Sequence, residues 1–405
     1  MAIIAHLWLW PVALFALDLL YIAAASDRIE GLAERTYFYV GGRYEHVTQS
    51  KFGAGEVFTG QIYVEKLVPD SLAAHLFGNP IEAFQAYDRF RYPLVFIPGA
   101  GQTGTNFLNT PDNRPGWASY FLNQGYTVYL TDPPQRGRSP WIPSKGTVEA
   151  APVRYVQAYF TTPERYSLNV WPQASLHTQW PGTGLVGDPT FDAFYASQVQ
   201  LQTSAFISDD NNKAADVALL ERIGPCILVT HSQSGPYGWV AGDARPDLVK
   251  GIVAIEPEGP PFASESFGPS GPTRVYGVTR LPLHYFPLVH DPNRDLKTVV
   301  VPPSGPNLSS CTLQAEPPRR LVSLARVPVV LITGEASYHA PYDYCTVLYL
   351  RQAGVEVTFM DLRAMGVKGN AHFLFMEKNN MEIADLVARW LGRIDEGGWL
   401  TESQV

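Results

Sequence analysis

The sequence contains little cysteine and no basic run, internal repeat or low-complexity tract. A formal net charge of −8 without basic clusters makes nucleic acid a poor candidate partner. The absence of a repeat period argues against a solenoid. No Cys/His spacing resembles a metal site, and no glycine-rich loop has a nucleotide-binding pattern, so the sequence implies no metal and no cofactor.

The three cysteines are Cys226, Cys311 and Cys345. Cys226 lies in an apolar run, where a free cysteine is most simply a small hydrophobic core residue. Cys311 and Cys345 are able to pair in an oxidising compartment, although an odd number of cysteines favours this only weakly.

Apolar and aromatic residues are plentiful. Of the 405 residues, 46% are hydrophobic and 17% are charged, which suffices for one large core. The chain also has 34 Pro, 34 Gly, 9 Trp, 21 Tyr and 20 Phe residues. This composition predicts long, ordered, aromatic loops around a scaffold, and such loops often form ligand pockets.

The first 25 residues indicate a targeting segment. An apolar stretch begins at Leu7 and is interrupted by Asp18, and Ala23-Ala24-Ala25 offers a cleavage site. We therefore expect residues 1–25 to be a secretory signal peptide. A membrane anchor and a helix packed on the domain are the alternatives, and Asp18 weakens the first of them. The sequon Asn307-Leu308-Ser309 is compatible with a secreted glycoprotein.

Short apolar runs alternate with longer helical or irregular segments over residues 26–405. The expected strands are 36–40, 57–64, 94–97, 127–130, 227–230, 252–255, 329–332 and 355–360. The expected helices include 213–222 and 381–394. Such alternation predicts an α/β fold with a doubly wound, mostly parallel sheet, which binds ligands beyond the carboxyl ends of its strands.

Two intervals interrupt this alternation, at about 140–210 and 259–325. The first is rich in aromatic residues, and the second is rich in Pro and Gly with an aromatic patch. We expect both to leave the sheet and to form an aromatic-rich cap over the site. The alternative is that these aromatic side chains fill a second core.

Residues 226–239 are the most informative stretch of the chain. A buried apolar run ends in Thr230-His231-Ser232-Gln233-Ser234-Gly235, and a helix is expected from Pro236. A serine on a sharp strand-to-helix turn is the nucleophile elbow of serine hydrolases, where the positions two before and two after must be small. If Ser232 is the nucleophile, these two positions are Thr230 and Ser234, which are both small. If Ser234 is the nucleophile, they are Ser232 and Pro236, and Pro236 fits the crowded site poorly. The alternative role for these hydroxyls is to cap the following helix.

A serine nucleophile needs a base, and the base needs an orienting carboxylate. His372 is the only histidine after the last expected strand, and it precedes the C-terminal helix, where this motif places its base. Glu256, Glu335 and Asp343 are the candidate acids. A carboxylate at a buried strand end, such as Glu256, must be paired, but the local sequence does not choose among the three.

The oxyanion hole needs two backbone N–H groups. One is expected from Gln233, the residue after the nucleophile. The other is expected from the loop 98–102 after the strand 94–97, where Ala100 is the predicted donor and Gly101 the alternative.

Eight segments between about residue 36 and the C-terminal helix form a specific combination. They are Tyr39–Tyr44, Gly99–Leu108, Arg114–Trp117, Arg136–Ser139, the elbow, Ile255–Pro260, Gly334–His339 and Gly369–Asn380. Together they resemble a branch of secreted microbial esterases in the α/β-hydrolase superfamily, whose acid is a Glu after the strand that follows the elbow. The resemblance implies that Ser232, Glu256 and His372 form the catalytic triad.

These features predict a secreted or membrane-associated carboxylic-ester hydrolase that acts through an acyl-enzyme on a small hydrophobic ester. The oxyanion loop departs from the family pattern, with Pro98 where His-Gly-Gly is usual and Ala100 in place of a glycine. This departure motivates one alternative, a lactonase or ring-closing enzyme of a natural-product pathway with the same site. A non-catalytic binding protein on the same fold is a third hypothesis.

Overall fold

The computed structural model describes residues 32–48, 51–70, 91–142, 146–166, 171–264 and 270–396. The expected targeting segment, residues 1–25, lies outside the described residues. Within the described ranges, no helix is both long enough and apolar enough to cross a membrane.

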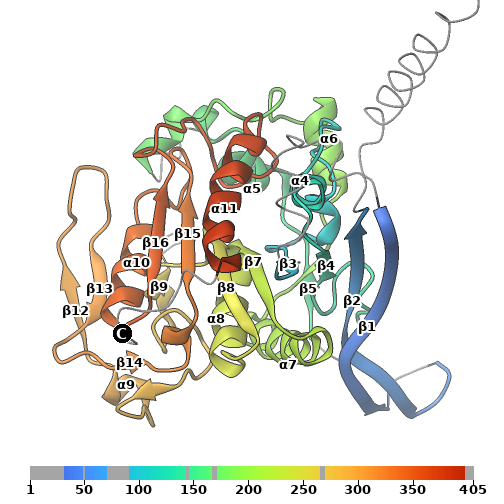
Figure 1. Cartoon of the computed structure of the whole chain (residues 1–405), viewed down its shortest axis with the longest axis horizontal. Helices are drawn as coiled ribbons and strands as arrows, with labels where there is room; N and C mark the ends of the chain where they lie inside the picture. Colours follow the sequence, from blue (N-terminus) through green and yellow to red (C-terminus); the bar gives the residue numbers. More distant parts are fainter. Residues whose placement is uncertain are drawn as a thin grey trace, which may run out of the picture.

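An eight-stranded sheet forms the centre of the molecule (Figure 1). In spatial order its strands are β1 (Leu32–Val47), β2 (Gly55–Pro69), β4 (Val128–Asp132), β3 (Leu94–Ile97), β7 (Cys226–His231), β8 (Val249–Ile255), β15 (Val329–Thr333) and β16 (Val357–Asp361). The strands from β4 to β16 run parallel, whereas the β1–β2 hairpin is antiparallel and joins β4 in antiparallel fashion. The predicted α/β fold with a mostly parallel sheet is therefore confirmed.

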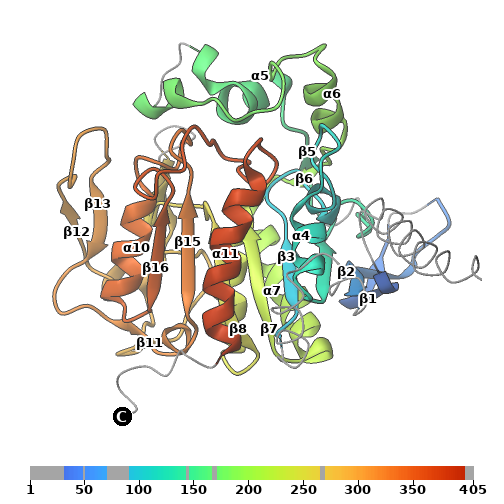
Figure 2. The same cartoon turned by 45° about the horizontal axis from the view of Figure 1, so that its top comes forward.

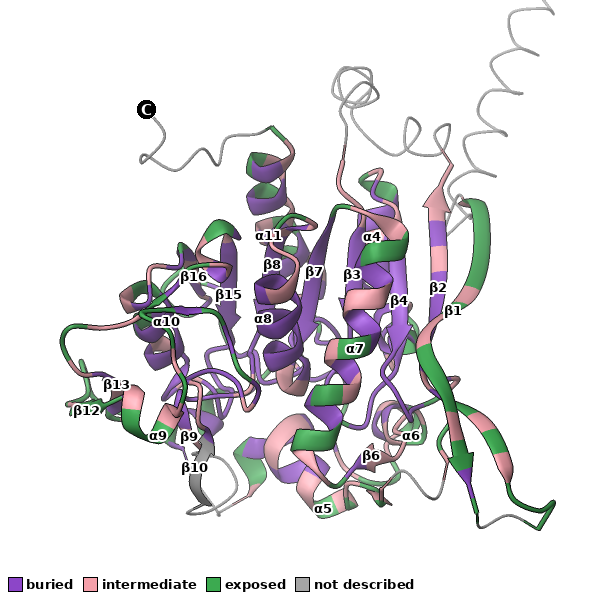
Figure 3. Ribbon diagram, turned by 90° about the horizontal axis from the view of Figure 1, so that it is seen from below, coloured by how far each residue is buried: buried purple, intermediate pink, exposed green. Residues whose placement is uncertain are grey.

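Helices cover both faces of the sheet, because successive side chains of a strand point to opposite sides. Val95 and Ile97 pack in one hydrophobic cluster, and Leu94 and Phe96 pack in the other. The first cluster includes buried side chains of α7 (Ala205–Ile223), α8 (Gly235–Ala244) and α10 (Asp343–Gln352). The second includes side chains of α4 (Trp117–Asn123) and α11 (Asn380–Asp395). Figure 3 shows the buried parallel strands between these layers.

Two long helices among the described residues, α7 and α11, contain both expected helical segments. α7 begins after Ser204, whose side chain accepts a hydrogen bond from the backbone N–H of Ile207. It ends at Ile223 and is followed by Gly224, where φ is 81°. α11 buries a stripe of residues three and four positions apart, as an amphipathic helix on a sheet does. The stripe is Ile383, Ala384, Val387, Trp390, Leu391 and Ile394.

The first insertion lies across the carboxyl ends of the strands (Figure 2). It contains β5 (Val148–Glu149), α5 (Val153–Val156), a π turn (Gln157–Thr161), 3-10 turns (Pro163–Arg165 and Pro172–Leu176), α6 (Pro189–Ala196) and β6 (Leu201–Gln202). It is therefore placed to enclose whatever binds at this end of the sheet.

The second insertion forms small two-stranded sheets at the side of the molecule. Its elements are β9 (Phe262–Ser264), β10 (Ser270–Arg274), β11 (Tyr285–Phe286), α9 (Pro292–Asp295), β12 (Thr298–Val301), β13 (Cys311–Gln314) and β14 (Arg320–Leu321). A disulfide between Cys311 and Cys345 ties β13 to α10, whereas Cys226 is a buried free thiol. Cys226 is thus the buried core residue that was expected, and the structure pairs the two cysteines whose bonding the sequence leaves open.

Candidate active site

Ser232 lies on the turn between β7 and α8 with a left-handed backbone, at φ 55°. This conformation is strained for a residue that has a side chain, and such strain clusters at functional sites. The turn is tightly packed, since a Cβ on Gly235 would lie 2.4 Å from the Cβ of Pro257. Ser232 lines a pocket, whereas Ser234 is fully buried and donates to the carbonyl of Ile97 at 2.6 Å. The side chain of Ser232 is therefore accessible from the pocket, whereas the side chain of Ser234 is buried and stabilises the turn by its hydrogen bond to Ile97.

His372 and Glu256 form a buried pair at the same end of the sheet. Nδ1 of His372 lies 2.6 Å from Oε2 of Glu256. Glu256 also accepts hydrogen bonds from the backbone N–H of Gly334 at 2.7 Å and from the hydroxyl of Ser337 at 2.5 Å. Because each carboxylate oxygen has a donor, the orientation of the carboxylate is well determined. A proton on Nδ1 leaves Nε2 as the nitrogen of His372 that is able to accept a proton.

Burial governs the protonation of this pair. Burial, together with the nearby His231 and His339, lowers the pKa of His372 well below its usual value. The imidazole is therefore neutral and able to accept a proton. Burial and the charge of Asp343 raise the pKa of Glu256, and the donors Ser337 and Gly334 partly oppose this rise. An imidazolium formed here would depend on Glu256 as its counter-charge.

The other two candidate acids have different partners. Asp343 Oδ1 lies 2.8 Å from Nδ1 of His339, and its Oδ2 accepts from the hydroxyl of Thr333 at 2.7 Å. Glu335 accepts from the backbone N–H of Gly369 at 2.9 Å. The structure therefore brings Glu256, rather than Glu335 or Asp343, to His372.

The loop after β3 approaches the elbow closely. A Cβ on Gly99 would lie 2.8 Å from Nδ1 of His231 and 3.0 Å from the Cβ of Ser232, so this approach requires glycine. Ala100 and Gln233, the two predicted oxyanion donors, line the same pocket as Ser232.

Arg136 connects this loop to the elbow. The side chain is buried, with 1% of the residue exposed. Nη1 donates to the carbonyl of Gly99 at 2.7 Å, and Nη2 donates to Oε1 of Gln233. One guanidinium thus bonds to both the loop after β3 and the residue after Ser232, the two segments predicted to supply the oxyanion donors. The sequence shows Arg136 within a family motif, but no local signal indicates this bridge.

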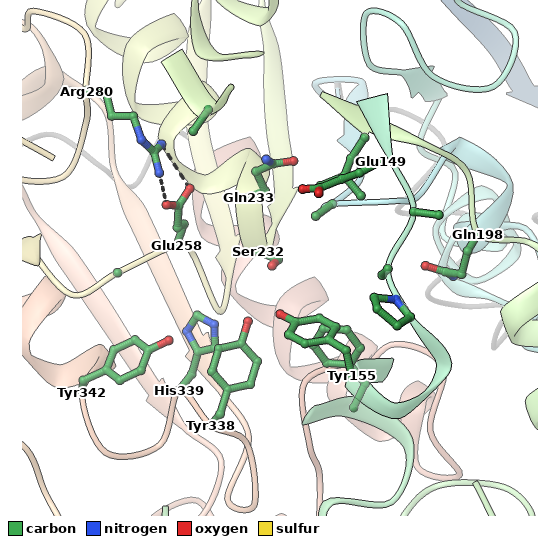
Figure 4. A pocket seen from close by; sticks show the side chains of 18 residues that line it. Glu149, Tyr155, Gln198, Ser232, Gln233, Glu258, Arg280, Tyr338, His339 and Tyr342 are labelled. Carbon is green, nitrogen blue, oxygen red and sulfur yellow. Dashed lines mark hydrogen bonds and ion pairs between the residues drawn. The ribbon is translucent and has the colours of Figure 1, made fainter. Parts of the chain in front are cut away.

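A cavity of about 420 Å³ opens around Ser232 (Figure 4). One side of it is aromatic, with Tyr155, Phe160, Tyr338 and Tyr342. The other side is polar, with Glu149, Gln198, Gln233, Glu258 and Arg280. Arg280 is paired with Glu258 and with Asp209. The second insertion contributes Gly259 and Arg280 to this lining. The first contributes Tyr155 and Phe160 to the aromatic wall, and the segment after β15 contributes Tyr338 and Tyr342.

His177 joins the cap to the loop that carries His372. Its Nδ1 lies 3.0 Å from Glu164, and its Nε2 lies 2.8 Å from Oε1 of Glu377, which also accepts from the backbone N–H of Ala371 at 3.1 Å. Burial alone would lower the pKa of His177, but hydrogen bonds to the two carboxylates raise it to about 9. The protonated ring therefore holds two carboxylates together at neutral pH.

Donor atoms of Glu256, His339 and His372 lie within 4.8 Å of one another, a spacing that could suit a metal ion. The Nδ1 atoms of both histidines, however, already contact carboxylates. The two imidazole rings also stack, with centroids 5.0 Å apart and planes 10° from parallel. Hydrogen bonding and stacking account for this cluster as it stands.

Two comparisons found proteins similar to this chain, while no protein-family model matches it. The chain is 51% identical over 364 residues to a protein of Fungal sp. (strain ATCC 74256) named "Probable secreted lipase phiG". The aligned region covers 90% of this chain and 91% of that protein. The fold is similar to that of a bacterial esterase, with a TM-score of 0.58 and 21% identity over 90% of this chain and 97% of the other.

Proposed function

Since the chain has an α/β-hydrolase fold and belongs to the family of the protein named "Probable secreted lipase phiG", to which it is 51% identical, we propose that it hydrolyses a carboxylic ester through an acyl-enzyme on Ser232. The observation that carries this proposal is that a strained serine and a buried His–Glu pair lie at the same end of the sheet. A strained, partly exposed serine lies at the pocket, and the buried His372–Glu256 pair is linked to it through the hydroxyl of Tyr338.

In the first half of the reaction, Oγ of Ser232 attacks the ester carbonyl while Nε2 of His372 takes its proton. Glu256 orients the imidazole and stabilises the imidazolium. His372 then protonates the leaving alcohol. In the second half, His372 takes a proton from a water molecule, and the water oxygen attacks the acyl-enzyme. The bond between the acyl carbon and Oγ of Ser232 then breaks, His372 returns the proton to Oγ, and the acid is released.

The developing oxyanion is held by the backbone N–H groups of Ala100 and Gln233. Support for this pair comes from their common pocket and from the close approach of Gly99 to the elbow. Arg136 acts as a positioning residue, because it bonds to Gly99 and Gln233 at once.

The aromatic wall of the cavity favours a hydrophobic acyl or alcohol group of moderate size. The name of the fungal relative, "Probable secreted lipase phiG", points in the same direction. The alternative of a lactonase or ring-closing enzyme would use the same residues, and neither comparison favours it.

Secretion is part of the proposal, with residues 1–25 removed as a signal peptide and Asn307 glycosylated. Three observations support it. The fungal relative is named as secreted. The Cys311–Cys345 disulfide is typical of oxidising compartments. Asn307 is exposed, as an acceptor of a glycan must be.

The test is a burst assay with p-nitrophenyl esters of increasing chain length, comparing the wild type with Ser232→Ala. In the wild type we expect a stoichiometric burst of p-nitrophenol followed by steady turnover, and in the variant neither. The acyl chain length that is hydrolysed fastest would indicate the size of the pocket. Ester hydrolysis that persists in Ser232→Ala would overturn the proposal. Turnover of lactones but of no ester would replace it by the alternative.

A further inference from the structure

Tyr338 brings a phenol hydroxyl to the reacting atoms of the proposed site. Its oxygen lies 3.4 Å from Nε2 of His372. The hydroxyl of Ser232 is also its hydrogen-bond partner. Figure 4 shows the Tyr338 hydroxyl directed toward Ser232 from the side opposite to Gln233. One phenol therefore contacts both the nucleophile and the base.

The surroundings hold this hydroxyl in place. The ring of Tyr338 is buried, and it packs against the rings of Tyr159 and Trp171 at centroid distances of 5.7 and 6.0 Å. Its neighbours in the chain are also anchored, since Ser337 bonds to the carboxylate of Glu256 and His339 pairs with Asp343. A side chain fixed on both sides is preorganised for a role at the site.

We propose that Tyr338 is a further catalytic residue, which donates a hydrogen bond to the leaving-group oxygen of the ester. This inference rests on the proposed roles of Ser232 and His372. When the tetrahedral intermediate collapses, the bond between carbon and the leaving oxygen breaks, and its electron pair moves to that oxygen. Nε2–H of His372 delivers its proton there, so the oxygen lies within hydrogen-bond distance of Nε2. The Tyr338 hydroxyl, which already contacts Nε2, then has this oxygen within reach.

The phenol acts as a donor and keeps its own proton. Burial is the main cause that raises the pKa of Tyr338 well above its usual value, so the hydroxyl stays protonated while the enzyme works. Its hydrogen bond stabilises the negative charge that builds on the leaving oxygen. That charge is larger when the leaving alcohol is more basic, so the contribution of Tyr338 grows from p-nitrophenol to an aliphatic alcohol.

The experiment compares wild type and Tyr338→Phe on esters that share one acyl group and differ in the leaving alcohol, from p-nitrophenol through trifluoroethanol to ethanol. The quantity measured is kcat/KM, which reports the steps up to acylation. We expect a loss of about tenfold or more for the ethyl ester, the usual scale for a hydrogen bond to a charged group. The p-nitrophenyl ester should lose much less.

A matched control is Tyr349→Phe, which removes a buried phenol hydroxyl that bonds to Tyr285 in the core at 2.5 Å. It should keep the wild-type dependence on the leaving alcohol. Equal losses for all alcohols in Tyr338→Phe, or no loss for any, would overturn the inference, provided that circular dichroism shows a folded variant. Failure of the proposed function would be distinct, because the wild type itself would then hydrolyse no ester through Ser232.

Discussion

Replacing Glu256 by Gln tests the acid of the triad, because it removes the charge and keeps the shape of the side chain. The carboxylate accepts hydrogen bonds from Gly334, Ser337 and His372. The amide of Gln has one acceptor oxygen, so its NH₂ group would face a donor. The variant therefore loses the counter-charge of the imidazolium and leaves a donor unsatisfied.

The size of the effect follows from the geometry of the pair. When His372 takes the proton of Ser232, a positive charge forms on a ring whose Nδ1 lies 2.6 Å from Oε2 of Glu256. For charge centres about 4 Å apart and an effective dielectric constant of about 20, the attraction is about 4 kcal/mol. Since about 1.4 kcal/mol of barrier is a factor of ten, kcat should fall about 10³-fold.

The assay is steady-state hydrolysis of a p-nitrophenyl ester by the folded variant, with melting by circular dichroism as the check on folding. Glu335→Gln is the matched control, because Glu335 follows the neighbouring strand but bonds to Gly369 instead of His372. We expect the control to retain most of its activity. A loss of less than about tenfold in Glu256→Gln, or equal losses in both variants, would refute the reasoning.

Two further predictions concern stability. His177 has its pKa raised from 6.5 to about 9, so its ion pairs contribute about 3 kcal/mol that is fully present below pH 6.5 and lost as the pH rises through about 9. The melting temperature should fall over this pH range in the wild type and not in His177→Gln. If the melting temperatures of the two proteins change in parallel with pH, the prediction is wrong. Cys345→Ser opens the link to Cys311 across a sequence separation of 34, which should cost about 4 kcal/mol of chain entropy. An unchanged urea midpoint in the variant would be inconsistent with that estimate.

The sheet and the elbow could be predicted because their signals are local. Each parallel strand is a short apolar run bounded by polar or turn residues, so the expected 94–97 coincides with β3 and 329–332 lies within β15. The elbow needs small residues near its nucleophile, and that requirement is visible within five positions of Ser232.

The choice of acid could not be made from local sequence, because β8 and β15 are neighbours and an acid follows each of them. Glu256 meets His372 because Gly334 and Ser337, which come from the loop after β15, turn its carboxylate by their hydrogen bonds. Those donors lie far from Glu256 in the sequence. The bridge made by Arg136 depends in the same way on contacts across the fold.

The most direct test of the central claim is covalent labelling of the wild type with an organophosphonate, followed by mass measurement of the intact protein and of its peptides. We predict one label per chain on Ser232, with ester hydrolysis lost in proportion to labelling and no label in Ser232→Ala. A label on another serine such as Ser234, or full activity after Ser232 is labelled, would contradict the account.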